Sequence, residues 1–331
     1  MKALRSHARG GPETLVLDEV ADPVPGPGEV LIAVEACGIN FPDTLIVEDL
    51  YQYKPERPFS PGAEVAGTVT SLGEGVTRFK LGDRVAALLI FGGLCEKIAV
   101  AEASIFALPA GLDMTTAAAI PLAYGTALHA LKHRAALQAG ETLLVLGAAG
   151  GTGIAAVELG KAMGARVVAA VSSEEKAEAA RKAGAAEAVI YGRPPFDKDQ
   201  SRALVAAFKA ACGPGGAQVI YDAVGGDYAE PAIRAIGWQG RYLVIGFAAG
   251  IPRLPLNLTL LKSCDVRGVF YGEFINREPA ANAELIAELF AMTASGRIAP
   301  PVSHTYPLAR GGEAIAELGE HRAIGKIVVT T

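Results

Sequence analysis

The chain has few cysteines, few aromatic residues and no large excess of charge of either sign. Of its 331 residues, 4 are cysteines, 1 is tryptophan and 6% are aromatic. The cysteines lie far apart and form no CxxC pair: Cys37, Cys95, Cys212 and Cys264. This spacing excludes a small disulfide-stabilised scaffold and predicts reduced thiols, as in cytoplasmic proteins.

Long apolar runs are also missing. The longest segment without Asp, Glu, Lys or Arg covers residues 114–131, and Pro121, Gly125 and His129 interrupt it. Such a segment is too polar to cross a bilayer. The first residues, MKALRSHARGG, contain no apolar core of a signal peptide. We therefore expect a cytoplasmic protein with no membrane partner.

The charge balance argues against a nucleic-acid partner. Lys and Arg total 30 against 35 Asp and Glu, so the net charge is −5. Hydrophobic residues make up 51% of the chain and glycines number 39, which is typical of a globular protein with a large core. The length predicts about two domains.

The first hundred residues have the pattern of a β domain. Strand-like runs are separated by segments rich in glycine and proline, such as DPVPGPGE. The expected strands cover residues 15–17, 30–34, 65–69 and 84–87.

After Asp113 the pattern changes to alternating strands and helices. We expect a helical stretch over 114–137 with a bend near Pro121, and then a parallel, doubly wound sheet of the Rossmann type. Its strands are predicted at 142–146, 166–171, 187–190, 218–221, 240–245 and 265–270. The helices are predicted at 153–163, 174–183, 201–212, 227–236 and 279–293. A last β run at 326–330 could rejoin the first domain, which predicts one domain at 1–121 and 296–331 and the other at 122–295.

A glycine-rich turn carries the clearest chemistry. The strand that ends at Leu146 is followed by GAAGGTG, and a helix begins at once. Glycines permit a tight turn and a close approach of the backbone to a pyrophosphate, and the helix start offers free N–H groups to it. Gly150, Gly151, Thr152 and Gly153 are therefore predicted to bind a dinucleotide.

The end of the second Rossmann strand bears on which dinucleotide binds. Sites for NAD usually have an acidic residue there, whereas this chain has Ser172, Ser173 and Lys176, which suit the 2′-phosphate of NADPH. Two alternatives stay open: the serines could only cap the next helix, or Glu174 or Glu175 could turn inward to NAD. Tyr191 and Arg193 could stack on adenine or meet the phosphate.

Several motifs together resemble a known family. They include PGPGEVLIAVEACGINFPDTL, PFSPGAEVAG, GVTRFKLGDRVA, AAAIPLAYGTALHAL, DAVGG, LVIGFAAG and GKIVV, and their order covers essentially the whole chain. The chain is similar to medium-chain dehydrogenase/reductases, and specifically to their zinc-free NADPH:quinone oxidoreductase (zeta-crystallin-like) branch. The resemblance implies an α/β protein with a GroES-like β domain and a Rossmann domain, with the active site in the cleft.

The resemblance also implies roles for individual residues. Zinc-dependent relatives have a cysteine and a histidine where this chain has Asn40 and Ala63, and the lobe with four structural cysteines is absent. His129 and His133 share a helix face, but HALKH lacks the glutamate of HExxH, so we expect no metal. Asn40 and Tyr51 are the expected catalytic residues. The expected neighbours of the cofactor are Asn40, Thr126, Val224, Ile245, Gly246, Phe247, Phe270 and Tyr271, with Lys326 near the pyrophosphate.

We therefore expect an enzyme that transfers hydride from NADPH to a quinone or an α,β-unsaturated carbonyl without zinc. A substrate that is already electron-poor does not need a Lewis acid. Two alternatives remain: an enoyl- or acryloyl-thioester (CoA) reductase on the same scaffold, and a non-catalytic NADPH-binding protein. Because the strand 265–270 could form an uncovered sheet edge, and relatives pair there, we also expect a homodimer.

Overall fold

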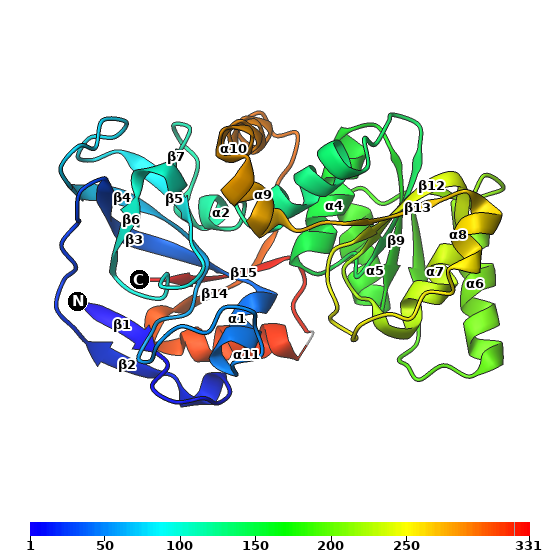
Figure 1. The fold of residues 1–331 in the computed structure, drawn as a ribbon, viewed down its shortest axis with the longest axis horizontal. Helices are drawn as coiled ribbons and strands as arrows, with labels where there is room; N and C mark the ends of the chain where they lie inside the picture. Colours follow the sequence, from blue (N-terminus) through cyan, green and yellow to red (C-terminus); the bar gives the residue numbers. More distant parts are fainter. Residues whose placement is uncertain (321) are drawn as a thin grey trace. The chain divides into compact units, whose positions relative to one another are not determined.

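The computed structural model describes residues 1–320 and 322–331, which form two compact units. Unit 1 contains Met1–Gly125 and Glu278–Thr331, and unit 2 contains Thr126–Arg277 (Figure 1). The chain therefore leaves the first unit once and returns to it. The second boundary differs from the expected one, because the helix α10 (Pro279–Ala294) belongs to unit 1 and not to the Rossmann part.

Unit 1 is built on a seven-stranded sheet with the order β14-β15-β3-β4-β5-β7, and β6 also pairs with β3. A separate two-stranded sheet joins β1 and β2. The strands are β1 (Lys2–Arg5), β2 (Val16–Glu19), β3 (Glu29–Ile39), β4 (Glu64–Leu72), β5 (Arg84–Leu88), β6 (Lys97–Ala101), β7 (Ile105–Ala107), β14 (Val302–Pro307) and β15 (Lys326–Thr330). The last strand, β15, is antiparallel to β3, so the end of the chain does return to the first sheet.

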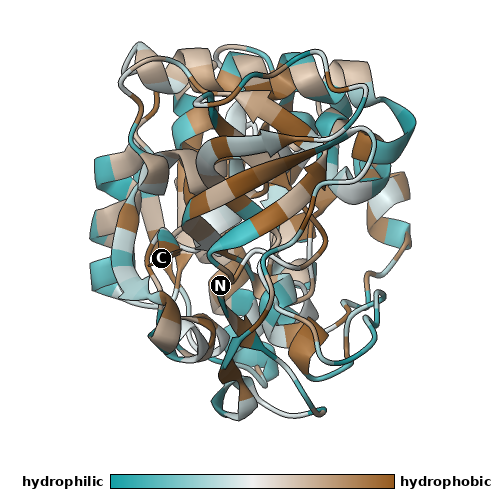
Figure 2. Ribbon diagram, turned by 90° about the vertical axis from the view of Figure 1, so that its left-hand side faces the viewer, coloured by the Kyte–Doolittle hydropathy of each residue, from teal (hydrophilic) through white to brown (hydrophobic). Residues whose placement is uncertain are grey.

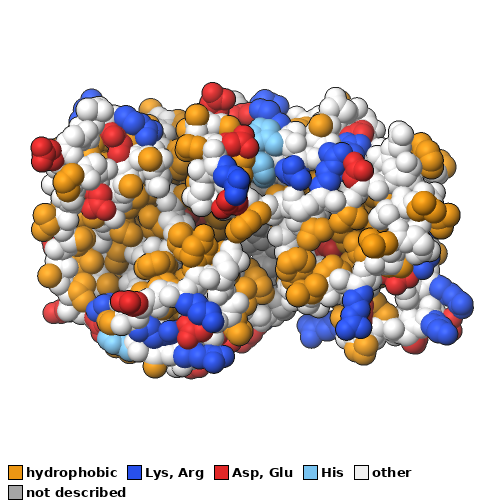
Figure 3. All heavy atoms as spheres, viewed as in Figure 1, with side chains coloured by type: hydrophobic (Ala, Val, Ile, Leu, Met, Phe, Trp, Pro, Cys, Tyr) orange, Lys and Arg blue, Asp and Glu red, His pale blue; other side chains and the backbone are white. Residues whose placement is uncertain are grey.

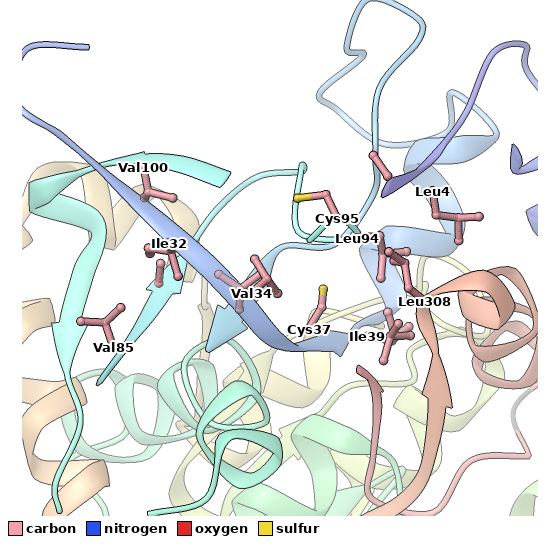
Figure 4. Packing of buried hydrophobic residues seen from close by; sticks show 14 of the residues in the cluster. Leu4, Ile32, Val34, Cys37, Ile39, Val85, Leu94, Cys95, Val100 and Leu308 are labelled. Carbon is pink, nitrogen blue, oxygen red and sulfur yellow. The ribbon is translucent and has the colours of Figure 1, made fainter. Parts of the chain in front are cut away.

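The core of unit 1 combines both parts of its chain. Leu308, which follows β14, lies in the same buried cluster as Ile39 and Leu94 (Figure 4). Figure 2 shows hydrophobic residues along the strands of unit 1, which faces the viewer there. Residues on alternate positions of the strands supply this core, because successive side chains of a strand point to opposite faces. The helices of unit 1 are α1 (Phe41–Val47), α2 (Met114–Ala118), α10 and α11 (Gly311–Gly319).

Unit 2 has the doubly wound arrangement that the alternating pattern predicts. Its six parallel strands have the order β10-β9-β8-β11-β12-β13. They are β8 (Thr142–Leu146), β9 (Arg166–Val171), β10 (Glu187–Ile190), β11 (Ala217–Asp222), β12 (Ile236–Val244) and β13 (Asp265–Gly268). The strand order reverses between β8 and β11, and ligands bind beyond the carboxyl ends of such strands.

Helices cover both faces of this sheet. One layer contains α4 (Gly151–Ala162) and α5 (Glu174–Ala183), and the other contains α6 (Lys198–Cys212) and α7 (Ala229–Arg234) (Figure 1). Two short helices complete the unit, α8 (Asn257–Lys262) and α9 (Tyr271–Arg277). Because both faces are covered, β8 and β9 are almost entirely buried and apolar. No helix in the described part of the chain is long and apolar enough to cross a membrane.

The helical stretch expected over 114–137 is divided into three pieces. It consists of α2, α3 (Ala123–Leu128) and a π-helical segment, His129–Arg134. Pro121 has no N–H to continue a helix, and the N–H of Leu122 is donated to the carboxylate of Glu64 at 2.8 Å. The break is therefore stabilised by a side chain that is distant in sequence.

Candidate active site and cofactor-binding residues

The glycine-rich turn of unit 2 is shaped for a close approach by a ligand. A Cβ atom on Gly153 would lie 2.0 Å from the carbonyl oxygen of Gly147, so the turn itself requires glycine there. Gly150 is different, because a Cβ on it would meet only the Gly147 oxygen, at an ordinary 3.6 Å. The fold therefore leaves space above Gly150 that a ligand can use.

The helix that follows this turn offers donors to an anion. Gly150 is the N-cap of α4 and has no side chain to accept hydrogen bonds from the first amides, which belong to Gly151, Thr152 and Gly153. These N–H groups and the positive end of the helix dipole favour a phosphate group. The four predicted glycine-turn residues form the N-cap and the first three positions of α4.

The ends of β11 and β12 are joined next to this turn by one carboxylate, that of Asp222. Its Oδ1 accepts hydrogen bonds from the N–H groups of Val224 and Gly225, both at 2.8 Å, and its Oδ2 accepts one from the Tyr242 hydroxyl. Its carbonyl oxygen accepts from the N–H of Ile245 at 2.9 Å. Burial raises the pKa of Asp222 against the effect of these hydrogen bonds.

The predicted residues Val224, Ile245, Gly246 and Phe247 therefore lie at the carboxyl edge of the sheet. Gly246 also donates its N–H to the Asp222 carbonyl oxygen, at 3.3 Å. Phe247 is largely exposed and free to contact a ligand. The sequence motif DAVGG marked this loop, but only the structure shows that Asp222 organises it.

The end of β9 brings together hydroxyl and basic groups. The Ser173 hydroxyl accepts a hydrogen bond from the N–H of Lys176 at 3.3 Å, so Ser173 does cap α5. The Lys176 ammonium lies 3.4 Å from the Ser172 hydroxyl. Partial burial, followed by the charge of Arg193, lowers the pKa of Lys176. Two basic side chains and the Ser172 hydroxyl, which accepts a hydrogen bond from Lys176, thus lie near one another here.

One of the two acidic residues that could turn inward to NAD is already engaged in an ion pair. Glu174 pairs with Arg181, with 2.7 Å between Oε1 and Nη1. Glu175 is exposed and lies near Lys176, and its negative charge partly opposes the lowering of the Lys176 pKa. Tyr191 packs against Tyr228, with ring centroids 4.6 Å apart, and burial raises its pKa.

The remaining predicted residues of unit 2 lie in and around α3 and α9. Thr126 is partly buried in α3, and Phe270 is exposed just before α9. Tyr271 is buried, with its ring 6.1 Å from that of His129. His129 stacks on Phe274 and its Nδ1 lies 3.2 Å from that of His133, so one histidine donates a hydrogen bond to the other.

Unit 1 contains a buried ion pair that the sequence analysis missed. The ammonium of Lys326, on β15, lies 2.8 Å from Oε1 of Glu64, on β4. The two side chains are 1% and 0% exposed. Lys326 also donates to Oδ1 of Asn40 at 2.6 Å and to the carbonyl oxygen of Ile39 at 2.9 Å. All three of its hydrogens are therefore used within unit 1.

Lys326 was expected near the pyrophosphate, and that position stays a prediction, but the geometry argues against a direct hydrogen bond to it. With its three donors satisfied and its side chain buried, Lys326 has no hydrogen left for a pyrophosphate. The signal was present in the sequence, because a single charge opens each of two apolar strands, in GAEVAG and in GKIVV. Charged residues are almost never fully buried unless they are paired.

Asn40 is a link in the same cluster. Its amide nitrogen donates to Glu64 Oε1 at 2.8 Å and to the carbonyl oxygen of Gly38 at 3.2 Å. Both amide hydrogens are used, so this arrangement leaves none for a substrate oxygen. Gly38 is needed for the close packing, because a Cβ there would lie 2.6 Å from Glu64 Oε1.

A second buried carboxylate, Asp43, holds the start of α1. It accepts the N–H of Asn40 at 2.8 Å and that of Gly62 at 2.9 Å. Burial raises its pKa to about 6, against the effect of these two hydrogen bonds. Asp43 therefore stabilises the start of α1, and it fixes the backbone of Asn40.

Tyr51 lies in the loop after α1. Its side chain packs on apolar residues, whereas the side chain of Asn40 lies in the polar cluster with Glu64 and Lys326. Its ring packs against the small cluster of Ile46, Val47 and Phe59, and it lies 6.0 Å from the ring of Tyr53. Burial, followed by the nearby Tyr53, raises its pKa. The phenol is therefore protonated at neutral pH and can donate a hydrogen bond.

The comparisons with known proteins agree with this architecture. Residues 26–130 match the family model of the alcohol dehydrogenase GroES-like domain, and residues 151–288 match that of the zinc-binding dehydrogenases. The chain is 35% identical to quinone oxidoreductase-like protein 2 of Bos taurus, over 96% of this chain and 89% of that protein. It is 33% identical to the quinone oxidoreductase of Lama guanicoe, over 99% and 97%.

A solved structure has the same fold throughout. The Escherichia coli quinone oxidoreductase complexed with NADPH has a TM-score of 0.90 and 29% sequence identity, and the match covers 100% of both chains. The chain therefore belongs to the medium-chain dehydrogenase/reductase superfamily, in its quinone oxidoreductase branch. As a member of this branch it is an oxidoreductase.

The buried pair leads to a stability prediction. We expect Lys326→Met to lower the free energy of unfolding by about 3–5 kcal/mol, because it leaves the Glu64 charge buried without a partner. Adding Glu64→Gln should restore most of this loss, since it removes the unpaired charge and keeps an acceptor. Urea unfolding of the three proteins measures both effects.

The matched control is Lys182→Met, because Lys182 forms an exposed ion pair with Glu178 at 3.0 Å. Exposed pairs contribute about 0–1 kcal/mol. A loss for Lys326→Met no larger than that for Lys182→Met would contradict the assignment of the buried pair.

Proposed function

We propose that the protein reduces quinones or α,β-unsaturated carbonyl compounds with NADPH and needs no metal ion to do so. The observation that carries this proposal is the group of Lys176, Ser172 and Arg193 at the carboxyl end of β9. A ribose 2′-phosphate would neutralise the charges of Lys176 and Arg193 and accept a hydrogen bond from the Ser172 hydroxyl. The 2′-hydroxyl of NADH carries no charge and would not neutralise them. The pyrophosphate would lie on Gly150–Gly153, at the start of α4.

Residue identities in unit 1 support a reaction without zinc. In the zinc-dependent relatives that the chain resembles, ligands occupy the positions of Asn40 and Ala63. Ala63 has no ligating atom, and Asn40 is already bound to the Lys326 ammonium. No group of three or more His, Cys, Asp or Glu residues in the described part of the chain could hold a metal.

NADPH supplies the hydride when it is bound. The protein's own contribution is to hold the cofactor and to stabilise the negative charge that develops on the substrate oxygen. We assign this second task to Tyr51, because its hydroxyl is protonated at neutral pH and its ring is held by an apolar cluster. Asn40 has its amide hydrogens engaged, so its part is to anchor the strand end before α1. Water provides the final proton.

The proposal extends to a homodimer. β13 lies at one edge of the parallel sheet, and its Val266 is 41% exposed. An edge strand offers unpaired backbone groups to a second chain, and pairing two copies of β13 would cover them. We further propose that the protein acts in the cytoplasm and has neither a membrane nor a nucleic acid as its partner, in line with its net charge of −5.

The cofactor assignment is tested by Lys176→Gln. We expect the KM for NADPH to rise about tenfold to a hundredfold and that for NADH to change little, because only NADPH has the phosphate. The control is Lys182→Gln on the same helix, which is paired with Glu178. Equal changes for both cofactors would contradict a contact with the 2′-phosphate.

The reaction is tested by following NADPH oxidation at 340 nm with a simple quinone and with an enone, before and after dialysis against a chelator. We expect turnover that the chelator does not reduce. Tight NADPH binding with no oxidation by either acceptor would instead favour a non-catalytic protein. Turnover with an enoyl-CoA alone would favour the thioester reductase.

Within this reaction, Tyr51→Phe should lower kcat/KM about a hundredfold, because it removes one hydrogen-bond donor to the developing oxyanion. Tyr53→Phe is the matched control, since Tyr53 lies in the same loop and its ring neighbours that of Tyr51. An unchanged kcat/KM for Tyr51→Phe would remove Tyr51 from the mechanism.

The dimer is tested by light scattering at micromolar concentration. We expect a dimer for the unmodified chain and a monomer for Val266→Asp, which would place two like charges at the paired edge. Ile190→Asp is the control, because Ile190 is 48% exposed at the opposite edge, on β10. A monomeric unmodified chain, or the same effect from both variants, would contradict pairing through β13.

A further inference from the structure

One side of unit 2 carries a groove between α6, α7 and α8 that the proposed reaction does not use. It contains two hollows, of about 720 Å³ and about 810 Å³. Lys209, Arg234 and Lys262 line both hollows, so the two adjoin and form one surface feature, the α6–α8 groove. Both hollows are wide open at the surface.

The groove has a surplus of positive charge. Lys198, Lys209 and Lys262 line it, and in the described part of the chain none of them has a carboxylate within ion-pair distance. The acidic residues beside it are engaged elsewhere. Glu230 lies 2.6 Å from Arg234, and Asp197 accepts two backbone N–H groups at the start of α6. In a protein with a net charge of −5, these ammonium groups make a local site for an anion.

The same groove exposes apolar surface. Ile233 and Leu258 are buried residues that line it. At the surface, Leu261 of α8 is 64% exposed and Trp238 of β12 is 68% exposed. Figure 3 shows hydrophobic and basic side chains together on this part of unit 2, over α6 and α8. Contiguous apolar surface bordered by one sign of charge marks a binding site rather than ordinary surface.

The second hollow of the groove is separate from the cofactor residues. It is lined by residues 213–216, which precede β11, and by Trp238 near the start of β12. These segments lie at the amino edge of the parallel sheet, whereas the glycine-rich turn, Val224 and Ile245 lie at the carboxyl edge. The first hollow extends to Phe196, whose ring lies 5.2 Å from that of Tyr228, the neighbour of Tyr191. A ligand held between Lys209, Lys262 and Trp238 would therefore leave the dinucleotide site free.

We propose that the α6–α8 groove binds a soluble anionic amphiphile, a molecule with a phosphate group on one apolar chain. The phosphate accepts charge-assisted hydrogen bonds from Lys209 and Lys262, which line both hollows. The apolar chain lies against Leu261 and Trp238 and removes their exposed surface from water. A neutral amphiphile would not pair with the basic residues of the groove, and inorganic phosphate would not cover its apolar residues.

The chain contains its own reporter for this binding. Trp238 is the single tryptophan, so its emission reports on the groove without a label. Dodecyl phosphate, titrated below its micelle concentration with saturating NADP⁺ present, should shift this emission to shorter wavelength and saturate. We expect Lys209→Gln and Lys262→Gln each to raise the Kd about tenfold. Lys80→Gln, an exposed lysine of unit 1, is the control and should leave the Kd unchanged.

Several results would overturn the proposal. These are no shift with dodecyl phosphate, an equal shift with a neutral dodecyl ether or inorganic phosphate, and a Kd that neither lysine variant changes. If the lysine variants instead alter the mass in light scattering, a second copy of the chain covers the groove. If only anionic vesicles shift the emission, the surface binds a membrane and not a soluble amphiphile.

Discussion

The buried ion pair between Lys326 and Glu64 is the interaction on which unit 1 depends. The two residues are 262 positions apart in the chain, and their contact joins the last strand to the middle of the first sheet. Taking two charges out of water costs several kcal/mol per ion unless every hydrogen bond is satisfied. Here the lysine has three acceptors, and the carboxylate accepts from Lys326, Asn40 and the N–H of Leu122. The same site holds Leu122 at the break after α2 and the side chain of Asn40.

Unit 2 uses a buried carboxylate in a related way. Asp222 receives backbone N–H groups from the loop after its own strand and a hydroxyl from the neighbouring strand. A carboxylate whose oxygens accept several hydrogen bonds fixes several amides at once. A hydrophobic contact cannot do this because it has no direction. Asp43 does the same at the start of α1. In each unit, therefore, the loops that carry candidate site residues are positioned by polar groups with no exposure to water.

Local patterns predicted much of the fold, and distant contacts account for what they missed. The strands 142–146, 166–171 and 326–330 were predicted with the same limits as β8, β9 and β15, because an apolar run between turn residues is a local signal. The π-helical segment 129–134 was missed, and its His129 stacks on Phe274, which is distant in sequence. The ion pair of Lys326 was also missed, because a single charge at the start of an apolar strand indicates a buried partner but does not identify Glu64 as that partner.

The buried cluster also bears on which substrates suit the proposed reaction. A cation next to Asn40 could in principle polarise a carbonyl, as a metal does, but the Lys326 ammonium has no donor left and no access to solvent. In the proposed reaction, the developing charge would then be stabilised by hydrogen bonds such as the one assigned to Tyr51. A simple ketone would concentrate this charge on one oxygen, whereas a quinone or an enone spreads it over a conjugated system. Under this proposal, conjugated acceptors would therefore suit unit 1 better than isolated carbonyl groups.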